Sequence, residues 1–314
     1  MIKGTYIFYE NGKEIGRHSN VITKFGKRFL TNFLAGNVSF NAKELALGIA
    51  NGSDYAVSDS NSRLGFEFYR IPVEFGTTNI QSDGSGGFTY GVTYKATLPQ
   101  TLVGKINEIG LYPGNRQSSV IYSDKFISDF ENNLIWSYSD GTSPDIIQND
   151  NVRIGSYMID LTVSSPSQSE TITANTNSLD ISGYSVNDSL TLAYYKVDTH
   201  LSSISVKFYS SDTDYFQADF TTPSGTGNKI VEVSLADMLN NPVGTPDSSA
   251  INKIGVVISS NSSGSSTVYL EGLRINDEDS FSPSYGIISR ALISGGLDKV
   301  LGRTVDVEYR LELF

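Results

Sequence analysis

Hydrophobic and polar residues alternate along much of the chain, and this period of two indicates β-strands with one buried and one solvent-facing side. The clearest case is residues 305–313, where valine, tyrosine and leucine occupy the odd positions and charged residues the even positions. A strand with one wet face is typical of an antiparallel sheet. We therefore expect this last segment to pair with the strands that open the chain.

The first 125 residues predict strands interrupted by one helix. Asn11-Gly12 lies between two strand-like runs and supplies the two positive-φ residues of a type I′ hairpin turn. Apolar residues recur at helical spacing from Val21 to Leu34, and Gly36-Asn37 would end this amphipathic helix. The other strands expected in this block are one at 46–50, a pair at 66–73 and 88–98, and a closing strand at 105–112.

From residue 127 onward the chain predicts a run of short strands separated by turn residues. The expected strands are residues 153–161, 179–182, 189–197, 203–209, 215–220, 229–235, 254–258 and 267–275. One helical turn is expected at 234–239. So many short strands with little helix predict a β-sandwich or jelly roll.

Composition and charge narrow the classes of function. The chain has 314 residues, no cysteine, and 34 acidic against 23 Lys and Arg residues, which gives a net charge of −11. Nucleic-acid binding needs a basic stripe, and the short cluster of Lys24, Lys27 and Arg28 is interpreted as a solvated helix face. The chain has neither an apolar run long enough for membrane insertion nor a secretory leader, so we expect it to be made in a cytoplasm.

The N-terminal block resembles virion proteins of bacteriophages, which occur in tail fibres, collars and baseplates. The resemblance is carried by the Asn-Gly hairpin followed in order by residues 19–36, 46–53, 64–70 and 106–112, and by 289–293 and 304–313 near the end. It implies a structural protein of the particle, assembled in the host bacterial cytoplasm, with other virion proteins as partners. It also implies a symmetric homo-oligomer, as in many particle proteins.

The middle block resembles the jelly rolls of carbohydrate-binding modules. The matching segments are 129–131 with Trp136, then 155–157, 179–184 and 268–275. Together the two resemblances imply an all-β protein. A discontinuous antiparallel β-sandwich domain with one amphipathic helix, residues 1–125 with 277–314, would carry an inserted jelly roll at 126–276. The alternative is three serial units, with the last 38 residues packed on a neighbouring subunit.

Aromatic side chains on a wet sheet face are the candidates for glycan binding, because sugar C–H faces pack on rings. Strand alternation sets Tyr195, Tyr209 and Tyr215 out of phase with the apolar core positions, so they are expected to share a face. Trp136 on an early strand is the fourth candidate. Ordinary strand tyrosines are the alternative interpretation, since tyrosine favours strands.

A structural calcium ion is the one cofactor that the chain suggests, since calcium takes carboxylate and carbonyl oxygens. By resemblance, Glu131 on the first strand of the jelly roll and Glu271 on the last would approach each other, with Asp129 nearby. The family usually carries an aspartate where this chain has Glu271. Solvent-facing acids are the alternative.

No catalytic residue is assigned. The two histidines, His18 and His200, are far apart in sequence, and no zinc-protease, Walker or serine-hydrolase motif occurs. The leading hypothesis is thus a non-enzymatic virion component of the tail, baseplate, fibre or capsid decoration. The alternative is an adsorption protein that binds a host surface polysaccharide, followed by a glycan depolymerase.

Overall fold

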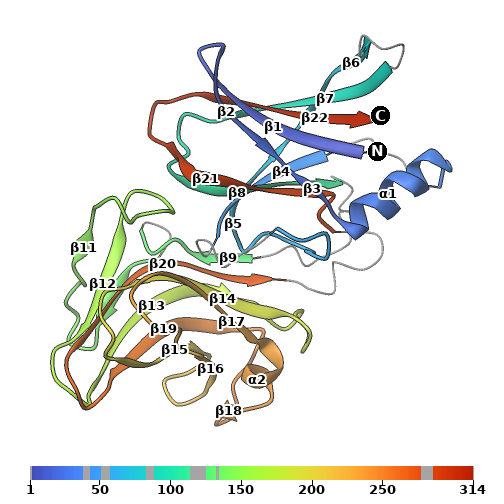
Figure 1. Cartoon of the computed structure of the whole chain (residues 1–314). Coiled ribbons are helices and arrows are strands. Elements are labelled where there is room, and N and C mark those ends of the chain that lie inside the picture. The colour runs from blue at the N-terminus through green and yellow to red at the C-terminus, as the bar shows by residue number, and fades with distance from the viewer. Residues whose placement is uncertain are drawn as a thin grey trace. The chain divides into compact units, whose positions relative to one another are not determined.

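The computed structural model describes residues 2–37, 43–50, 57–82, 88–113, 125–131, 134–276 and 286–313. The fold is all-β, built from antiparallel sheets, with two short helices among these residues (Figure 1). The chain forms two compact units. The first unit is Met1–Ser119 with Phe281–Phe314, and the second unit is Val120–Ser280. The boundaries expected from the sequence follow residues 125 and 276.

The first unit is a sandwich of two five-stranded sheets. One sheet has the order β2 (Lys13–Ser19), β1 (Ile2–Glu10), β22 (Val305–Leu313), β7 (Phe88–Leu98) and β6 (Glu74–Ser82). The other has the order β3 (Val21–Ile22), β21 (Ser289–Lys299), β8 (Gly104–Pro113), β4 (Lys43–Ile49) and β5 (Phe66–Pro72). Their inner faces share one hydrophobic core.

Strand β22 lies between β1 and β7, which confirms the predicted return of the last segment to the opening hairpin. Tyr309 pairs with Tyr6 on one side and Tyr94 on the other, and its ring centroid lies 4.7 and 6.4 Å from theirs. The alternative of a serial third unit is therefore wrong, because the final strand completes a sheet of its own chain. The Asn11-Gly12 turn also has the expected positive φ at both residues.

The expected pairing of 66–73 with 88–98 is wrong. Strand β5 belongs to one sheet and β7 to the other, and the neighbour of β7 is β6. Strand β6 does not show the regular alternation of a half-buried strand, because it is an edge strand with exposed Phe75 and Ile80. Because its sequence lacks this alternation, the strand at 74–82 was not predicted.

Helix α1 (Lys24–Leu34) begins three residues later than the apolar spacing suggested, since Val21 is part of strand β3. Thr23 is its N-cap and accepts a hydrogen bond from the Gly26 amide, and the Thr23 amide donates to the Ile288 carbonyl at 3.1 Å. Gly26 faces the Ile288 carbonyl so closely that a Cβ would collide with it. The helix backbone therefore packs directly on the backbone at Ile288, and only glycine fits at position 26.

The second unit is a sandwich of two sheets. The Tyr209 sheet has the order β10 (Trp136–Tyr138), β13 (Ser169–Leu179), β19 (Ile251–Ser260), β15 (Leu201–Tyr209), β16 (Tyr215–Phe220) and β18 (Pro242–Val243). The Tyr195 sheet has the order β11 (Ile146–Ile147), β12 (Met158–Val163), β20 (Ser266–Asn276), β14 (Ser189–Lys196) and β17 (Gly227–Ser234), with β9 (Lys125–Ser128) also paired to β20. The expected helical turn is present as α2 (Leu235–Leu239).

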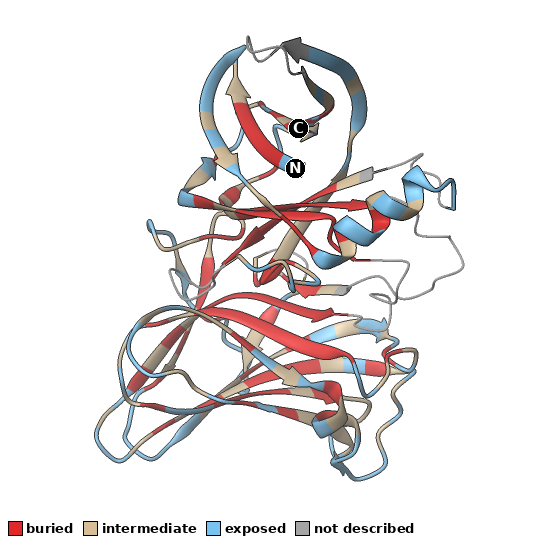
Figure 2. Cartoon of the chain, turned by 45° about the vertical axis from the view of Figure 1, so that its right-hand side comes forward, coloured by how far each residue is buried: buried red, intermediate tan, exposed pale blue. Residues whose placement is uncertain are grey.

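Buried positions lie mostly in strands, whereas turns and some strands of the first unit, such as β2, are mostly exposed (Figure 2). In the second unit one core of leucine, isoleucine, valine and aromatic side chains fills the space between the two sheets. Each sheet consequently has an inner face that is apolar and an outer face that carries the polar and amphipathic residues. Among the described residues, neither helix is long and apolar enough to cross a membrane.

Candidate functional site

The outer face of the Tyr209 sheet carries a cluster of aromatic and cationic side chains. On β15, Ile204, Val206 and Phe208 are buried in the core, so alternation turns Lys207 and Tyr209 outward. On β16 the same alternation turns Tyr215 outward while Phe216 is buried.

Tyr209 and Tyr215 form the centre of this cluster. They are directly opposite across β15 and β16, and their ring centroids lie 5.0 Å apart with an angle of 49° between the planes. A Cβ placed on Gly255 of the neighbouring strand would lie 3.1 Å from Cε2 of Tyr209. The tyrosine ring therefore lies over the glycine backbone, close to the sheet, where a larger residue would push it away.

Two lysines flank the rings. The Nζ atom of Lys207 lies 4.5 Å from the Tyr215 ring centroid, and Nζ of Lys253 lies 4.7 Å from that of Tyr209. Lys253 also contacts Oδ1 of Asp212 at 2.5 Å, whereas Lys207 forms no ion pair with the described residues. Burial raises the pKa of Tyr209, and nearby Tyr215 and Asp212 raise it further, so its phenol stays protonated and can donate. We call Lys207, Tyr209, Tyr215 and Lys253 the Tyr209 surface.

Tyr195 does not share this face, so the prediction of one three-tyrosine surface is wrong. Tyr195 lies on β14 of the other sheet, where it points outward opposite Tyr269 of β20. Alternation correctly placed each tyrosine out of phase with its own core. It could not say which strands share a sheet, because that depends on pairing between distant segments.

Trp136 is a core residue and not a wet-face residue. Its side chain is 4% exposed and stacks on Phe130 with ring centroids 4.9 Å apart. On β10 it pairs with Ala174, which is also buried. A ring enclosed in this way cannot contact a polysaccharide.

Glu271 is fully buried and paired with Arg153. Its Oε2 accepts from Nη2 and Nε of Arg153 at 2.6 and 2.9 Å, and its Oε1 accepts from the backbone amides of Arg153 and Ile154. A guanidinium thus supplies the positive charge beside this carboxylate. Both guanidinium donors share Oε2, which leaves Oε1 free to accept from the two backbone amides, and hydrogen bonds between ionised groups are stronger than neutral ones.

Glu131 contacts the residues that follow Arg153 and Ile154 in the loop 153–157. Its carboxylate accepts from the amides of Ser156 and Tyr157, and Gly155 has a φ of +67°, with no room for a Cβ against Glu131. Burial raises the pKa of Glu131, Asp129 adds to the rise, and the two amides oppose it. Asp129 accepts from the Glu131 amide at 2.9 Å.

The three acids predicted to bind calcium therefore do not form a common ligand set. Glu131 and Glu271 face the N–H groups of residues 153–157, whose amide donors repel a cation, and Arg153 lies on Glu271. Across the described residues, no group of three or more His, Asp or Glu side chains is placed to hold a metal ion. This geometry does not fit calcium.

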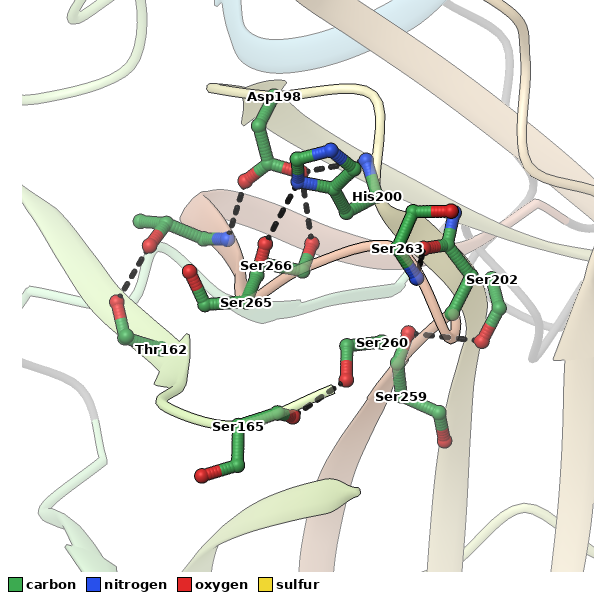
Figure 3. A network of polar contacts seen from close by, with 12 residues as sticks. Thr162, Ser165, Asp198, His200, Ser202, Ser259, Ser260, Ser263, Ser265 and Ser266 are labelled. Atoms are coloured by element: carbon green, nitrogen blue, oxygen red, sulfur yellow. Dashed lines mark hydrogen bonds and ion pairs between the residues drawn. The ribbon is translucent and has the colours of Figure 1, made fainter. Parts of the chain in front are cut away.

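His200 and Asp198 belong to a polar network that joins three turns of the second unit (Figure 3). Asp198 accepts from the His200 amide at 2.7 Å, the Thr267 amide at 2.6 Å and the Ser266 hydroxyl at 3.2 Å. Nδ1 of His200 lies 3.0 Å from the Ser265 carbonyl. The serine hydroxyl bonds to the aspartate instead of the histidine, so these residues lack the nucleophile–base contact of a hydrolase.

No protein-family model matches the chain, and no curated protein sequence matches it either. Solved structures with a similar fold include carbohydrate-binding modules. The family 11 module of the cellulosomal cellulase Lic26A-Cel5E of Clostridium thermocellum is 15% identical over 49% of this chain and 95% of its own, with a TM-score of 0.36. A family 30 module is 13% identical over 50% and 89%, with a TM-score of 0.39. An exo-β-agarase is 16% identical over 51% and 26%, with a TM-score of 0.36.

At these TM-scores the likeness carries no argument about function. Neither the proteins named above nor the geometry of the described residues gives evidence for a phage origin. What remains is the chemistry of the chain's own side chains. The Tyr209 surface offers ring faces and N–H and O–H donors, which can hold a polar ligand.

Proposed function

We propose that the chain is a non-enzymatic glycan-binding protein, and that the Tyr209 surface of its second unit holds the glycan. The observation that carries this proposal is the paired Tyr209 and Tyr215 on an outer sheet face, with Tyr209 lying over Gly255. Pyranose rings present C–H faces that pack on aromatic rings, and their hydroxyls need hydrogen-bond partners at the edge of the contact.

The flanking residues favour a sugar with a negative group. Lys207 has no acidic partner among the described residues, so its ammonium can pair with a carboxylate, sulfate or phosphate on a ligand. Gln217 pairs with Lys207 across β15 and β16, and its amide nitrogen donates to Oδ1 of Asp219 at 2.8 Å, so its amide oxygen is the group available to a ligand. We infer a preference for acidic over neutral glycans at this surface, with an affinity that falls as salt rises.

Tyr209→Ala and Tyr215→Ala are each expected to weaken glycan binding about tenfold or more, since each removes an aromatic face worth ~1.4 kcal/mol. The measurement is binding to an array of neutral and acidic oligosaccharides, with dissociation constants for those bound. Tyr90→Ala is the matched control, because Tyr90 is a half-exposed tyrosine of β7 in the first unit. Unchanged binding by both variants, with unchanged melting temperatures, would refute the proposal.

The predicted virion role concerns where the protein acts, and it stays a prediction. Its support is the resemblance of residues 19–36, 46–53, 64–70 and 106–112 to virion proteins of bacteriophages. In this role the chain would be present as a homo-oligomer in the virion. Mass spectrometry of purified particles from a host that encodes the chain tests this role, and its absence from them would exclude it.

The absence of catalysis is also a proposal. Incubation of the protein with each glycan that it binds, followed by a reducing-end assay, is expected to release no new ends. Released ends would instead support the glycan depolymerase considered from the sequence.

A further inference from the structure

The Tyr195 sheet carries a second pair of tyrosines on its outer face. Tyr195 of β14 and Tyr269 of β20 are directly opposite in the strand register. Their ring centroids lie 5.9 Å apart, and the ring planes differ by only 15°. The two rings therefore form a near-parallel pair, and both residues are partly exposed.

This tyrosine pair is not needed for the core of the sandwich. The preceding residue Tyr194 and the flanking Leu270 point to the opposite side and are fully buried there. Neither phenol hydroxyl forms a hydrogen bond within the described part of the chain, so both are available to a ligand. An aromatic pair that packs no core and keeps two available hydroxyls has the composition of a binding surface.

A chain of polar groups borders the rings on the same face. Asp160 of β12 pairs with Tyr269 across the strands. Its Oδ1 accepts from the Thr162 hydroxyl at 2.6 Å, and that hydroxyl lies 2.7 Å from the hydroxyl of Thr267. Burial raises the pKa of Tyr269, and the charge of Asp160 raises it further, so the phenol is held in its donating form.

The charge at these rings differs from that at the Tyr209 surface. No lysine or arginine lies over the rings of Tyr195 or Tyr269 among the described residues, and the nearest charged cross-strand partner of Tyr269 is Asp160. A carboxylate accepts hydrogen bonds from sugar hydroxyls but repels anionic sugars. The Tyr209 surface instead has Lys207 and Lys253 over its rings, and only Lys253 is paired with an acid, Asp212.

We propose that Tyr195, Tyr269 and Asp160, together the Tyr195 surface, form a second glycan-binding site that takes a neutral sugar. This inference rests on the proposed function, since it assigns the same class of ligand to the other outer face of the same sandwich. One sandwich would then bind two glycan segments of different charge. Two sites on one rigid body raise the overall binding strength for a long polysaccharide without any new contact.

The test uses the full chain and the same array of neutral and acidic oligosaccharides. Three proteins are compared: the wild type, Tyr209→Ala with Tyr215→Ala, and Tyr195→Ala with Tyr269→Ala. We expect the first double variant to lose acidic glycans and keep neutral ones. We expect the second to bind neutral glycans at least about tenfold more weakly, which is the effect of losing one aromatic contact, and to bind acidic glycans unchanged.

Two further variants separate binding from folding. Tyr195→Phe with Tyr269→Phe keeps both rings and is expected to retain most of the neutral-glycan binding. Asp160→Asn removes the negative charge and is expected to let acidic glycans bind at this face when the Tyr209 surface has been removed. Melting temperatures identify any variant that has lost its fold.

The outcomes distinguish the two proposals. If the Tyr195→Ala and Tyr269→Ala variant binds every array glycan like the wild type, the second site is refuted, and the proposed function stands provided that the other double variant loses binding. If neither double variant changes any binding, or the wild type binds no glycan, both proposals fail. If only the Tyr209→Ala with Tyr215→Ala variant loses binding, and it loses all glycans, the second site is refuted. If only the Tyr195→Ala with Tyr269→Ala variant loses binding, and it loses all glycans, the Tyr209 surface is refuted as the glycan site.

Discussion

Replacing Arg290 with methionine is expected to lower the free energy of unfolding of the first unit by about 3–5 kcal/mol, because it leaves a buried carboxylate without its cation. Arg290 and Glu108 are both fully buried. Nε of Arg290 donates to Oε2 of Glu108 at 2.9 Å, and Nη2 donates to the same oxygen. Methionine fills similar volume, so the loss reports the charge and its hydrogen bonds and not a cavity. Urea denaturation measures the change in the free energy of unfolding, and hydrogen exchange of peptides from the first unit assigns the change to that unit.

The effect should also depend on pH. Burial raises the pKa of Glu108, and Arg290 opposes that rise, so the variant has a still higher pKa in the folded state. A carboxyl whose folded pKa exceeds its unfolded pKa favours folding at low pH and loses that contribution as pH rises. The difference in free energy of unfolding between wild type and variant is therefore expected to narrow as pH falls from neutral through the raised pKa of Glu108 in the variant.

Arg17→Met is the matched control for Arg290→Met. Arg17 makes a similar two-bond contact with Glu14, at 3.0 and 2.8 Å, but both side chains are exposed. Exposed ion pairs contribute little, so this variant should unfold nearly as the wild type does. Equal losses from the two substitutions would contradict the role assigned to the buried pair.

The carboxylate of Glu108 also accepts two backbone hydrogen bonds, which limits how much stability a second substitution at Glu108 can restore to Arg290→Met. Its Oε1 accepts from the amides of Gly65 and Phe66 at 2.6 and 3.2 Å. Removing both charges with Glu108→Leu and Arg290→Met would leave those two amides without acceptors, which itself costs free energy. Glu108→Gln with Arg290→Met keeps an oxygen acceptor for them and should recover more stability than the Glu108→Leu pair.

Much of the fold could be predicted because strand alternation is a local property. The last strand, the Asn11-Gly12 hairpin and the α2 turn were each readable from a few neighbouring residues. Pairing between strands is not local, so β5 and β7 were assigned to one pair although they lie in different sheets. Strand β6 was missed because an edge strand with apolar residues left exposed lacks the alternation that burial on one face produces.

The site was predicted in part, for the same reason. Tyr209 and Tyr215 were found because each is out of phase with its own buried neighbours. The contribution of Lys253 and Gly255 depends on the register of β15 against β19, which no short segment encodes. Tyr269 had a usable signal, since it alternates with the apolar Val268 and Leu270, yet its match to Tyr195 appears only when β14 and β20 pair.

Arg153 illustrates a residue whose role the sequence did not suggest at all. Within the second unit it is 118 positions from Glu271, and both side chains are buried. The glutamates were read as calcium ligands because acids on the first and last strands of a jelly roll can meet there. Nothing in the residues next to Arg153 indicates that a guanidinium would lie against one of them.

Arg153→Met is expected to destabilise the second unit by about 3–5 kcal/mol, since Glu271 would remain buried beside two amides with no cation. For a unit of this size, that loss corresponds to a fall in melting temperature of roughly 6–20 °C. Lys229→Met is the control in the same unit, because the exposed hydrogen bond to the Ser224 carbonyl is the one contact that Nζ of Lys229 donates among the described residues. Thermal unfolding, with hydrogen exchange of peptides from 153–157, measures both variants.

The same experiment decides between guanidinium and calcium as the cation of this loop. If Arg153 supplies the positive charge, neither added calcium nor a chelator should change the melting temperature of the wild type. An ion stabilises a fold only by binding to it, and the carboxylate of Glu271 is already occupied by Arg153. A chelator-induced fall of several degrees, reversed by calcium, would show that Glu131 and Glu271 bind the ion after all. Arg153→Met would then cost little in the presence of calcium, which is the opposite of the loss expected from the buried pair.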